Sequence, residues 1–418
     1  MISVAEARAR IFEQLPRLHP KGQPLSEVLG CVTSVPLEAP EAVPPFDNTA
    51  VDGFAVHAAD TSSAPVELTV VGTLPAGAAW PDVIAPGTAL RIMTGAPMPA
   101  GADAVVMVED TAILEHTGTV SAADAGAEIV RIGRSVNPGD AVRRAGSDVR
   151  AGELVFDRFT VIGPAHVGML ASMGYRRVPV FSRARVGVLS TGDELVDDGS
   201  ALQPGQIRES NRQMLLAAVA AANCVPVDLG VARDTREAIT AALDRGVADC
   251  DAIVTSGGVS MGDFDLIKVL LRERGEMNWM QLAIKPAKPF AFGVLPGPKS
   301  DVGVPIFGLP GNPVSSLVSF ELLARPALRH MMGFPNPDRP IISAITDDGL
   351  RRRPDGKTHY TRVHGRFEAD GRFHIRSTGE QGSHQLASTS AANALAVVPD
   401  GDGIAAGGSV DVIVLSLG

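Results

Sequence analysis

The sequence predicts a multidomain α/β protein built around a doubly wound sheet domain. With 418 residues, the chain is too long for a single hydrophobic core, so two to four domains are expected. From Arg185 onward, short runs of β-branched residues alternate with segments of helix length, which is typical of a sheet with parallel strands. The expected strands cover residues 186–190, 225–229 and 252–255, and the expected helices cover 211–222 and 235–245.

Smaller β-rich segments flank this central region. Residues 3–15 have the apolar spacing of an amphipathic helix, and the Pro-rich stretch 25–45 is expected to be extended. Strands separated by Gly and Pro turns are expected at 66–71, 89–93, 104–108 and 128–132. Such a β insertion would leave the N-terminal segment and residues 143–178 to pack as one discontinuous domain. Short strands return after residue 333 and predict a small β domain or barrel.

Composition narrows the classes of function. The chain has 37 Lys and Arg against 47 Asp and Glu, a net charge of −10, which disfavours general binding to nucleic acid or membranes. An anionic substrate would therefore need a local basic pocket or a divalent cation. The three cysteines, Cys31, Cys224 and Cys250, have no metal-site spacing, which indicates a reducing compartment without structural zinc. The first residues do not resemble a signal peptide and no apolar run reaches about 18 residues, so we expect a soluble, cytoplasmic protein.

The stretch TSGGVSMGDFD, residues 255–265, carries the strongest local signal for a ligand site. It follows an expected buried strand, contains Gly257 and Gly258, and precedes an expected helix that begins at Leu266. A strand, a glycine turn and a helix start place free N–H groups where an anion can bind. Asp263 and Asp265 add carboxylates, which bind Mg²⁺ rather than phosphate. The alternative is a plain strand-to-helix turn in which Asp265 is the N-cap.

Other carboxylates are expected at the same edge of the sheet. Asp193 and Glu194 follow one expected strand, Asp234 follows the next, and Asp265 follows the third. Ligands of doubly wound sheets bind at the carboxyl ends of the strands. Because gathered carboxylates repel each other without a cation, this convergence favours a metal site that also binds phosphate.

A second anion site is expected nearby. The loop KPAKP places Lys285 and Lys288 before a strand, and LPGNP, residues 309–313, precedes a helix expected to run to Met331. Asn312 suits the N-cap and Pro313 the first helical position, so the helix start would offer further N–H groups. Alternatively, the two lysines only solvate a surface.

Three further segments leave alternatives open. The motif PPFDNTAVDGFAV, residues 44–56, suggests a binding loop or a tight turn between domains. Arg143, Arg144 and Asp148 could line an anion pocket or lie on exposed turns. The C-terminal region carries many basic residues, including Arg351–Arg353, Lys357 and Arg362. A solvated sheet face is favoured over nucleic-acid binding for these residues. A third interpretation is that they complete a pocket for an anionic substrate.

Six motifs follow one another along the chain: PPFDNTAVDGFAV, TGAPMPAGADAVVMVED, STGDEL, TSGGVSMGDFD, KPAKP and LPGNPVSS. Together they resemble the motifs of the molybdopterin molybdenumtransferase family, which includes the C-terminal domain of gephyrin. The resemblance spans essentially the whole chain. It implies an extended α/β domain (1–46 and 143–178), a β insertion domain (47–142), a sheet domain similar to molybdopterin adenylyltransferase (179–332) and a C-terminal β-barrel (333–418). It also implies an elongated homodimer with its site in a cleft between subunits.

The family's activity is insertion of molybdate into adenylylated molybdopterin, which releases AMP in the presence of Mg²⁺ or Zn²⁺. Matching motif positions imply catalytic roles for Asp52, Asp148, Glu194, Asp234 and Asp265, with Glu194, Asp234 and Asp265 as metal ligands. Together with the anion sites argued above, the expected substrate contacts are Thr94, Ser256, Gly257, Gly258, Ser260, Lys285, Lys288, Pro310, Gly311, Asn312 and Ser315. Candidate partners beyond molybdate and the pterin are the adenylyltransferase and molybdoenzyme apoproteins.

One position departs from the family pattern. Some members carry a lysine four residues before Lys285, where this chain has Gln281, so one candidate molybdate contact is lost or replaced by a neutral donor. Two other functions remain as alternatives: an adenylyltransferase, which the sheet domain alone would suit, and a non-catalytic scaffold of gephyrin type. A homodimer is also favoured because the N-terminal helix and the Pro-rich segment have no obvious apolar partner in their own small domain.

Overall fold

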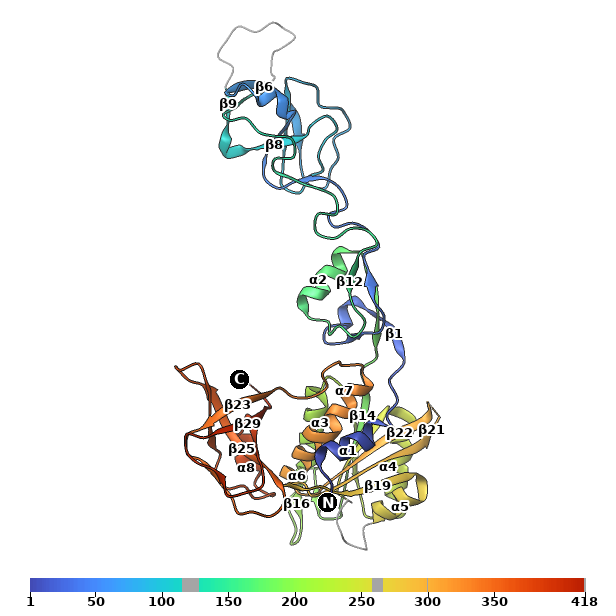
Figure 1. Ribbon diagram of the computed structural model, residues 1–418. Helices are drawn as coiled ribbons and strands as arrows, with labels where there is room; N and C mark the ends of the chain where they lie inside the picture. Colours follow the sequence, from blue (N-terminus) through green and yellow to red (C-terminus); the bar gives the residue numbers. More distant parts are fainter. Residues whose placement is uncertain (115–127, 258–265, 299, 417–418) are drawn as a thin grey trace.

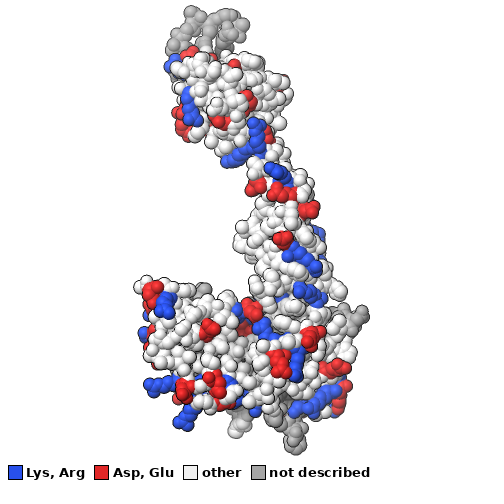
Figure 2. Space-filling model, in the orientation of Figure 1, with Lys and Arg blue, Asp and Glu red and all other residues white. Residues whose placement is uncertain are grey.

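The computed structural model describes residues 1–114, 128–257, 266–298 and 300–416. The chain is elongated (Figure 1). The β insertion lies at one end, a small α/β region follows through a narrow neck, and the central sheet domain and the C-terminal barrel lie side by side at the other end. Along the face in Figure 2, acidic and basic side chains are interspersed. Some of the exposed charges form ion pairs, such as Arg144 with Asp47 at 2.6 Å.

The central domain contains a six-stranded sheet in the order β17-β14-β18-β22-β21-β19. The first four strands are parallel, as the sequence predicts, but β21 runs antiparallel to β22 and β19 runs antiparallel to β21. The predicted parallel sheet thus has two antiparallel strands at this side, because β21 and β22 are joined by a connection too short for a crossover. The strands are β14 (Arg185–Thr191), β17 (Val225–Ala232), β18 (Ala252–Ser256), β19 (Glu276–Gln281), β21 (Pro289–Gly297) and β22 (Ser300–Leu309).

Helices cover both faces of this sheet, as a doubly wound domain requires. On one face, α4 (Arg236–Asp249) and α5 (Leu266–Arg274) bury residues such as Leu243 and Leu270. On the other face, α3 (Asn211–Ala221) packs with a long helix formed by α6 (Pro313–Ser319), a π-helical turn η4 (Phe320–Ala324) and α7 (Arg325–Met331). The fold-class prediction is confirmed.

The N-terminal helix α1 (Val4–Phe12) packs on the central domain. Ser3 accepts a hydrogen bond from the Glu6 N–H at 3.1 Å and so caps the helix. Ala7 and Ile11 are fully buried against the core that contains η4 and α7. The helix thus has an apolar partner within its own chain, and the argument that it needs a second copy is wrong.

The region next to the central domain is assembled from two separate stretches of chain. Its core contains Val28, Leu37 and Ala39 from the first stretch and Ile162 and Leu170 from the second. Its elements are β1 (Pro20–Pro24), η1 (Leu25–Glu27), β2 (Val32–Thr33), β3 (Leu37–Glu38), β12 (Leu154–Phe156), α2 (Pro164–Ser172) and β13 (Arg177–Phe181).

The β insertion forms a six-stranded sheet in the order β8-β5-β7-β6-β10-β9. Separate apolar clusters lie on its two sides, around Phe54 and around Leu90. At Gly53, a Cβ atom would lie 2.0 Å from the carbonyl oxygen of Val106, so only glycine permits this strand pairing. The elements are β4 (Asn48–Thr49), β5 (Gly53–Val56), η2 (Ala58–Thr61), β6 (Val66–Leu74), β7 (Thr88–Ile92), β8 (Ala104–Met107), η3 (Val108–Asp110), β9 (Thr111–Leu114), β10 (Ile129–Ile132) and β11 (Val142–Arg143).

The C-terminal region is a closed barrel of five strands, since β25 pairs with β26 on one side and with β27 on the other. The short strand β20 (Ile284–Lys285) of the central domain also pairs with β25, which joins the two domains. The remaining elements are β15 (Leu195–Val196), β16 (Ile207–Arg208), β23 (Ile341–Thr346), β24 (Leu350–Arg351), β25 (Thr358–Phe367), β26 (Phe373–Ser377), α8 (Leu386–Ser390), β27 (Ala394–Val398), β28 (Gly403–Ile404) and β29 (Ser409–Val414). Across the described parts of the chain, we find no helix with the length and apolar character of a membrane span.

Candidate functional site

The carboxyl edge of the central sheet brings several predicted residues together. The loops after β18 and β22 touch, because the Gly257 N–H donates to the Leu309 carbonyl at 3.0 Å. A Cβ atom on Gly311 would lie 3.9 Å from the Cα of Gly257, and Pro310 is buried between Leu309 and Gly311. Gly257 has φ +96°, a conformation that favours glycine. In Figure 1 this edge, marked by β16, faces away from the β insertion.

Acidic residues gather on the neighbouring strands of the same edge. The Asp234 N–H donates to Asp193 Oδ1 at 3.2 Å, which links the loops after β17 and β14. The pKa of Asp234 is raised, first by partial desolvation of its carboxyl group and then by the carboxylates of Asp193 and Glu194, although the residue as a whole is exposed. The Glu194 carboxylate lies over Gly192, where a Cβ atom would meet its Oε2 at 2.5 Å.

These carboxylates suit a hard cation such as Mg²⁺, because they are oxygen donors whose charges repel one another without a counter-ion. Within the described residues, however, no three or more His, Cys, Asp or Glu side chains form a complete metal-binding group. The third predicted ligand, Asp265, lies outside the described residues, as do the predicted substrate contacts Gly258 and Ser260.

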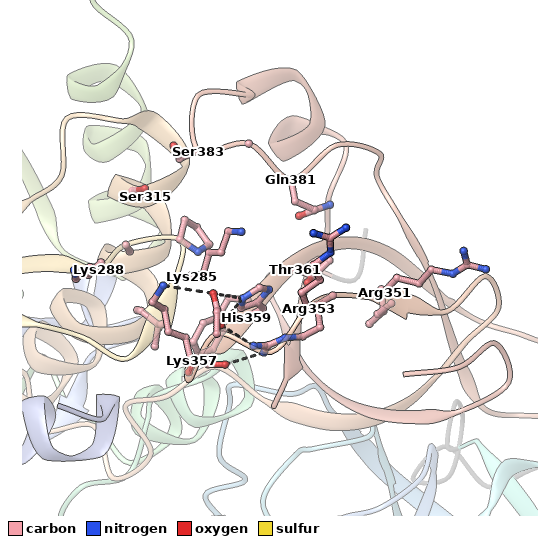
Figure 3. Close-up of a pocket in the computed structure, with 18 of the residues that line it drawn as sticks. Lys285, Lys288, Ser315, Arg351, Arg353, Lys357, His359, Thr361, Gln381 and Ser383 are labelled. Atoms are coloured by element: carbon pink, nitrogen blue, oxygen red, sulfur yellow. Dashed lines mark hydrogen bonds and ion pairs between the residues drawn. The ribbon is translucent and has the colours of Figure 1, made fainter. Parts of the chain in front are cut away.

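A cavity of about 950 Å³ lies where the central domain meets the barrel (Figure 3). The central domain contributes Lys285 and Lys288 from the KPAKP loop, and Ser315 from the start of α6. The barrel contributes basic and polar side chains, which include Arg351, Arg352, Arg353, Lys357, His359, Thr361, Gln381 and Ser383. The cavity exists because β20 pairs with β25, with Lys285 opposite His359.

The cavity is positively charged. Asp355 is its acidic lining residue and is already engaged, since it accepts from Arg352 Nη2 at 2.7 Å and from His359 Nε2 at 3.1 Å. The His359 hydrogen bond is the main reason that the pKa of Asp355 is lowered. Among the described residues, Lys285, Lys288, Arg351 and Arg353 have no ion-pair partner, and the acidic lining residue Asp355 is engaged by Arg352, Lys357 and His359. The arrangement can therefore hold an anion with more than one charge.

Arg362 is a further candidate that the sequence analysis placed on a solvated face. The residue is fully buried, and its Nη2 donates to the Glu380 carbonyl at 2.8 Å. Its Nε and Nη1 have no hydrogen-bond partner in the described part of the chain, and burial lowers its pKa. The side chain of Gln381 binds the backbone of Arg362 twice: its Oε1 accepts from the Arg362 N–H at 2.8 Å, and its Nε2 donates to the Arg362 carbonyl at 3.2 Å. The Arg362 guanidinium thus lies behind the loop that lines the cavity.

The solvated-face interpretation is wrong for Arg362 and for Arg352, whose side chain is only 3% exposed. The geometry favours the third interpretation, in which basic residues of the barrel complete an anion pocket. A signal was present in the sequence: in a strand, alternate residues share a face, so Arg362 lies on the same side as the buried Tyr360.

The start of α6 lies between the acidic edge and the basic cavity. Asn312 occupies the N-cap position and Pro313 the first helical position, as predicted, but the Asn312 side chain makes no capping hydrogen bond. The Val314 N–H donates to the Ser383 carbonyl of the barrel at 3.2 Å, so this group is not free for an anion. Ser315, which is 5% exposed, lines the cavity.

Asp52 and Thr94 form a pair in the β insertion. Asp52 Oδ1 accepts from both the N–H and the Oγ1 of Thr94, each at 2.6 Å, and these bonds lower the pKa of Asp52. The antiparallel pairing of β5 with β7 brings the two residues together. Asp148 is exposed in the neck, where its N–H donates to the Val43 carbonyl at 3.0 Å.

Asp52, Thr94 and Asp148 are therefore remote, within one chain, from Glu194 and Asp234. Figure 1 shows the insertion and the sheet edge at opposite ends of the molecule. Gln281, the last residue of β19, is not among the residues that line the basic cavity, whereas Lys285 and Lys288 are.

Comparison with known proteins identifies the class of this architecture. Three family descriptions match in chain order: the "MoeA N-terminal region (domain I and II)" over residues 2–174, the "Probable molybdopterin binding domain" over 187–330 and the "MoeA C-terminal region (domain IV)" over 349–415. The fold is thus that of the multidomain molybdopterin-binding proteins.

Individual relatives specify the family. The chain is 40% identical over 410 residues to Molybdopterin molybdenumtransferase 2 of Mycobacterium tuberculosis, covering 96% of each chain. It is 34% identical over 415 residues to the molybdopterin molybdenumtransferase of Haemophilus influenzae, covering 99% of this chain and 98% of the relative. A crystal structure of a molybdopterin biosynthesis moeA protein from Pyrococcus horikoshii OT3 superposes with a TM-score of 0.75 at 28% identity, covering 99% of this chain and 100% of that one. The chain belongs to the molybdopterin molybdenumtransferase family, and the resemblance seen in its motifs is confirmed.

Proposed function

We propose that this protein is an enzyme that inserts molybdenum into molybdopterin, by transfer from molybdate to the adenylylated pterin with release of AMP. The observation that carries the proposal is the basic cavity at the domain junction, where Lys285, Lys288, Arg351 and Arg353 have no ion-pair partner among the described residues. Relatives of 34–40% identity along the whole chain bear the name of this activity.

The cavity supports molybdate binding. Molybdate is a small dianion, and two lysines provide positive charge from a loop whose prolines already restrict the backbone. Lys285 and Lys288 would hold the dianion against Ser315, and the barrel would supply further donors from the opposite wall. The cavity is larger than one oxyanion, so part of it remains for the pterin or for solvent.

The glycine loops at the sheet edge support binding of the adenylylated pterin. Gly257 and Gly311 let the backbone approach a pyrophosphate closely, and Ser256 and Ser315 offer hydroxyl groups on either side. Asn312 and Pro310 fix the path of the second loop. The two sites are neighbours because the helix α6 begins between them, so molybdate and the pterin would meet near its first turn.

A divalent cation is part of the proposal. Glu194 and Asp234, with Asp265, would hold Mg²⁺ or Zn²⁺, which when bound offsets charge on the phosphoryl oxygens during cleavage. The raised pKa of Asp234 is caused first by desolvation and then by the carboxylates of Asp193 and Glu194, and this second contribution supports the role. The pterin itself has sulfur atoms to capture molybdenum, and all three cysteines of the chain are buried, Cys31, Cys224 and Cys250.

A homodimer would complete the site. If Asp52 and Thr94 act in the same reaction as Glu194 and Asp234, a second copy must bring them together, because the β insertion and the sheet edge lie at opposite ends of the molecule. A two-fold symmetric pair of elongated chains can place the insertion of each copy over the sheet edge of the other.

Incubation of the purified protein with molybdate, Mg²⁺ and adenylylated molybdopterin tests the proposal. We expect AMP and pterin-bound molybdenum in equal amounts, both dependent on molybdate. Pyrophosphate release from ATP and molybdopterin would instead identify an adenylyltransferase. Absence of turnover in both assays would favour a non-catalytic scaffold.

A further inference from the structure

The first residue of α3, Asn211, connects two loops of the candidate site. Its Nδ2 donates to Ser256 Oγ at 2.7 Å and to the Gly311 carbonyl at 2.6 Å. Ser256 ends β18, and Gly311 lies in the loop between β22 and α6. One side-chain amide, from a third element, therefore joins the loops that follow two neighbouring parallel strands.

The chemistry of these contacts fixes the orientation of the amide. A carbonyl oxygen only accepts hydrogen bonds, so the atom 2.6 Å from the Gly311 oxygen must be the amide nitrogen. Asn211 Oδ1 is buried and has no hydrogen-bond partner in the described part of the chain. Within the described residues, the hydrogen bonds of this side chain thus go to the two loops.

The neighbouring residues anchor the start of α3 to the same sheet edge. The Glu209 carboxylate, whose side chain is 1% exposed, accepts from Ser190 Oγ at 3.0 Å and from the Arg212 N–H at 2.7 Å. Ser190 lies near the end of β14, so residues 209–212 contact the ends of β14, β18 and the β22 loop. Arg212 extends the anchor to Asp197 at 2.6 Å.

We propose that Asn211 is a positioning residue, which holds the Ser256–Gly257 loop and the Gly311 loop at the separation that the adenylylated pterin requires. The inference rests on the proposed function, because it assigns those loops to that substrate. Asn211 itself contacts the loops rather than the reacting atoms. Its loss is therefore expected to weaken pterin binding more than it slows the chemical step.

The chain offers a matched control at the other end of the same helix. Asn223 follows α3, and its Nδ2 donates to the Gly30 carbonyl at 2.6 Å. Asn211→Asp and Asn223→Asp each place a carboxylate against a glycine carbonyl without changing side-chain size. Asn223 has φ +68°, which aspartate tolerates. Both variants lose a similar hydrogen bond, but only one is next to the candidate site.

The experiment measures the dissociation constant and KM for adenylylated molybdopterin, kcat, half-saturating molybdate and thermal unfolding. For Asn211→Asp we expect the pterin constants to rise at least about tenfold, with smaller changes in kcat and in half-saturating molybdate. Asn211→Ala, which adds no charge, should also raise the dissociation constant and KM for adenylylated molybdopterin. Asn223→Asp should lower the unfolding temperature similarly and leave the pterin constants within about twofold of the parent protein.

Two results would overturn the inference: pterin binding within about twofold of the parent in both Asn211 variants, or an equal loss in Asn223→Asp. Binding is measured separately from turnover so that the two proposals can fail independently. A parent protein that binds the pterin without transferring molybdenum would contradict the proposed function, while the binding constants would still decide the role of Asn211.

Discussion

The sheet edge and the β insertion both carry a carboxylate for which the family resemblance implies a catalytic role, and their environments differ. Asp234 lies beside Asp193 and Glu194, and its pKa is raised. Asp52 accepts two hydrogen bonds from Thr94, and its pKa is lowered. Among the described residues no cation pairs with the first carboxylate, whereas the second is already stabilised as an anion within its own domain.

This difference separates two roles for acidic residues. A carboxylate with a raised pKa among like charges gains most from a cation, so we expect a bound metal at the sheet edge rather than at Asp52. A carboxylate that holds a threonine through two bonds is better suited to fix a loop and to present a negative charge at a defined place. The basic cavity is similar to the sheet edge, because it also gathers charges of one sign. Four of its lysine and arginine residues have no ion-pair partner among the described residues and could bind an anion.

The largest effect is expected at the sheet edge. Glu194→Gln and Asp234→Asn should each lower Mg²⁺-dependent AMP release by about 100-fold or more, which corresponds to about 2.7 kcal/mol of transition-state stabilisation. Because a raised carboxyl pKa means that the folded state prefers the protonated form, Asp234→Asn should leave the unfolding temperature at pH 7 unchanged or slightly higher. Turnover is measured against Mg²⁺ concentration, with thermal unfolding as the control for folding. Unchanged activity in both variants would contradict the metal assignment.

The basic cavity is expected to show the next largest effect. Lys285→Ala removes a cation that has no described ion-pair partner, so half-saturating molybdate should rise about tenfold, while KM for the pterin changes less. Lys21→Ala is the matched control, because Lys21 is an exposed lysine on β1, outside this cavity. If the pterin KM rises instead and half-saturating molybdate does not, Lys285 binds the pterin phosphate.

The central domain could be predicted from the sequence because its signals are local. Buried strands such as Ala252–Ser256 appear as short apolar runs, and helix starts such as Asn312-Pro313 have their own residue preferences. The candidate ligand loops followed from the rule that parallel strands bind ligands at their carboxyl ends.

The residues that could not be predicted depend on long-range pairing. Alternation places Arg362 on the same face as Tyr360, but the burial of that face depends on the pairing of β25 with the distant strand β27. Asn211 looks like an ordinary helix start until β18 and β22 are known to be neighbours. The partner of α1 was missed for the same reason, since α7 and η4 lie more than 300 residues further along the chain.

The separation of the two acidic regions leads to a test with mixed subunits. We expect each variant, Asp52→Asn or Asp234→Asn, to have reduced activity when all subunits carry the same substitution. Co-expression with two different tags yields a dimer with one subunit of each kind. If each site combines the insertion of one copy with the sheet edge of the other, this dimer has one intact site and should recover about half of the parent activity. If each site lies within one chain, neither site is intact and activity stays at the level of the single variants. A monomeric protein at micromolar concentration would contradict the dimer itself.

The smallest effect expected is a pH dependence of the basic cavity through His359. The pKa of His359 is lowered, first by burial and then by the charges of Arg352 and Lys285. The hydrogen bond that His359 donates to Asp355 opposes this shift, and Lys357 also contacts Asp355. Since the folded pKa lies below the ordinary value of about 6.5, protonation occurs only at lower pH and costs folding stability there. The same protonation adds a cation to the cavity. As pH falls below about 6.5, molybdate affinity should therefore rise two- to threefold, on the order of 0.5 kcal/mol, while the unfolding temperature without molybdate falls.

His359→Gln should flatten both trends relative to the parent in calorimetric titrations from pH 8 to pH 5.5. Equal slopes in the two proteins would assign the pH dependence to other groups. Affinity and stability that moved in the same direction would show that His359 gains its proton from a favourable partner, in which case Asp355 rather than burial governs this side chain.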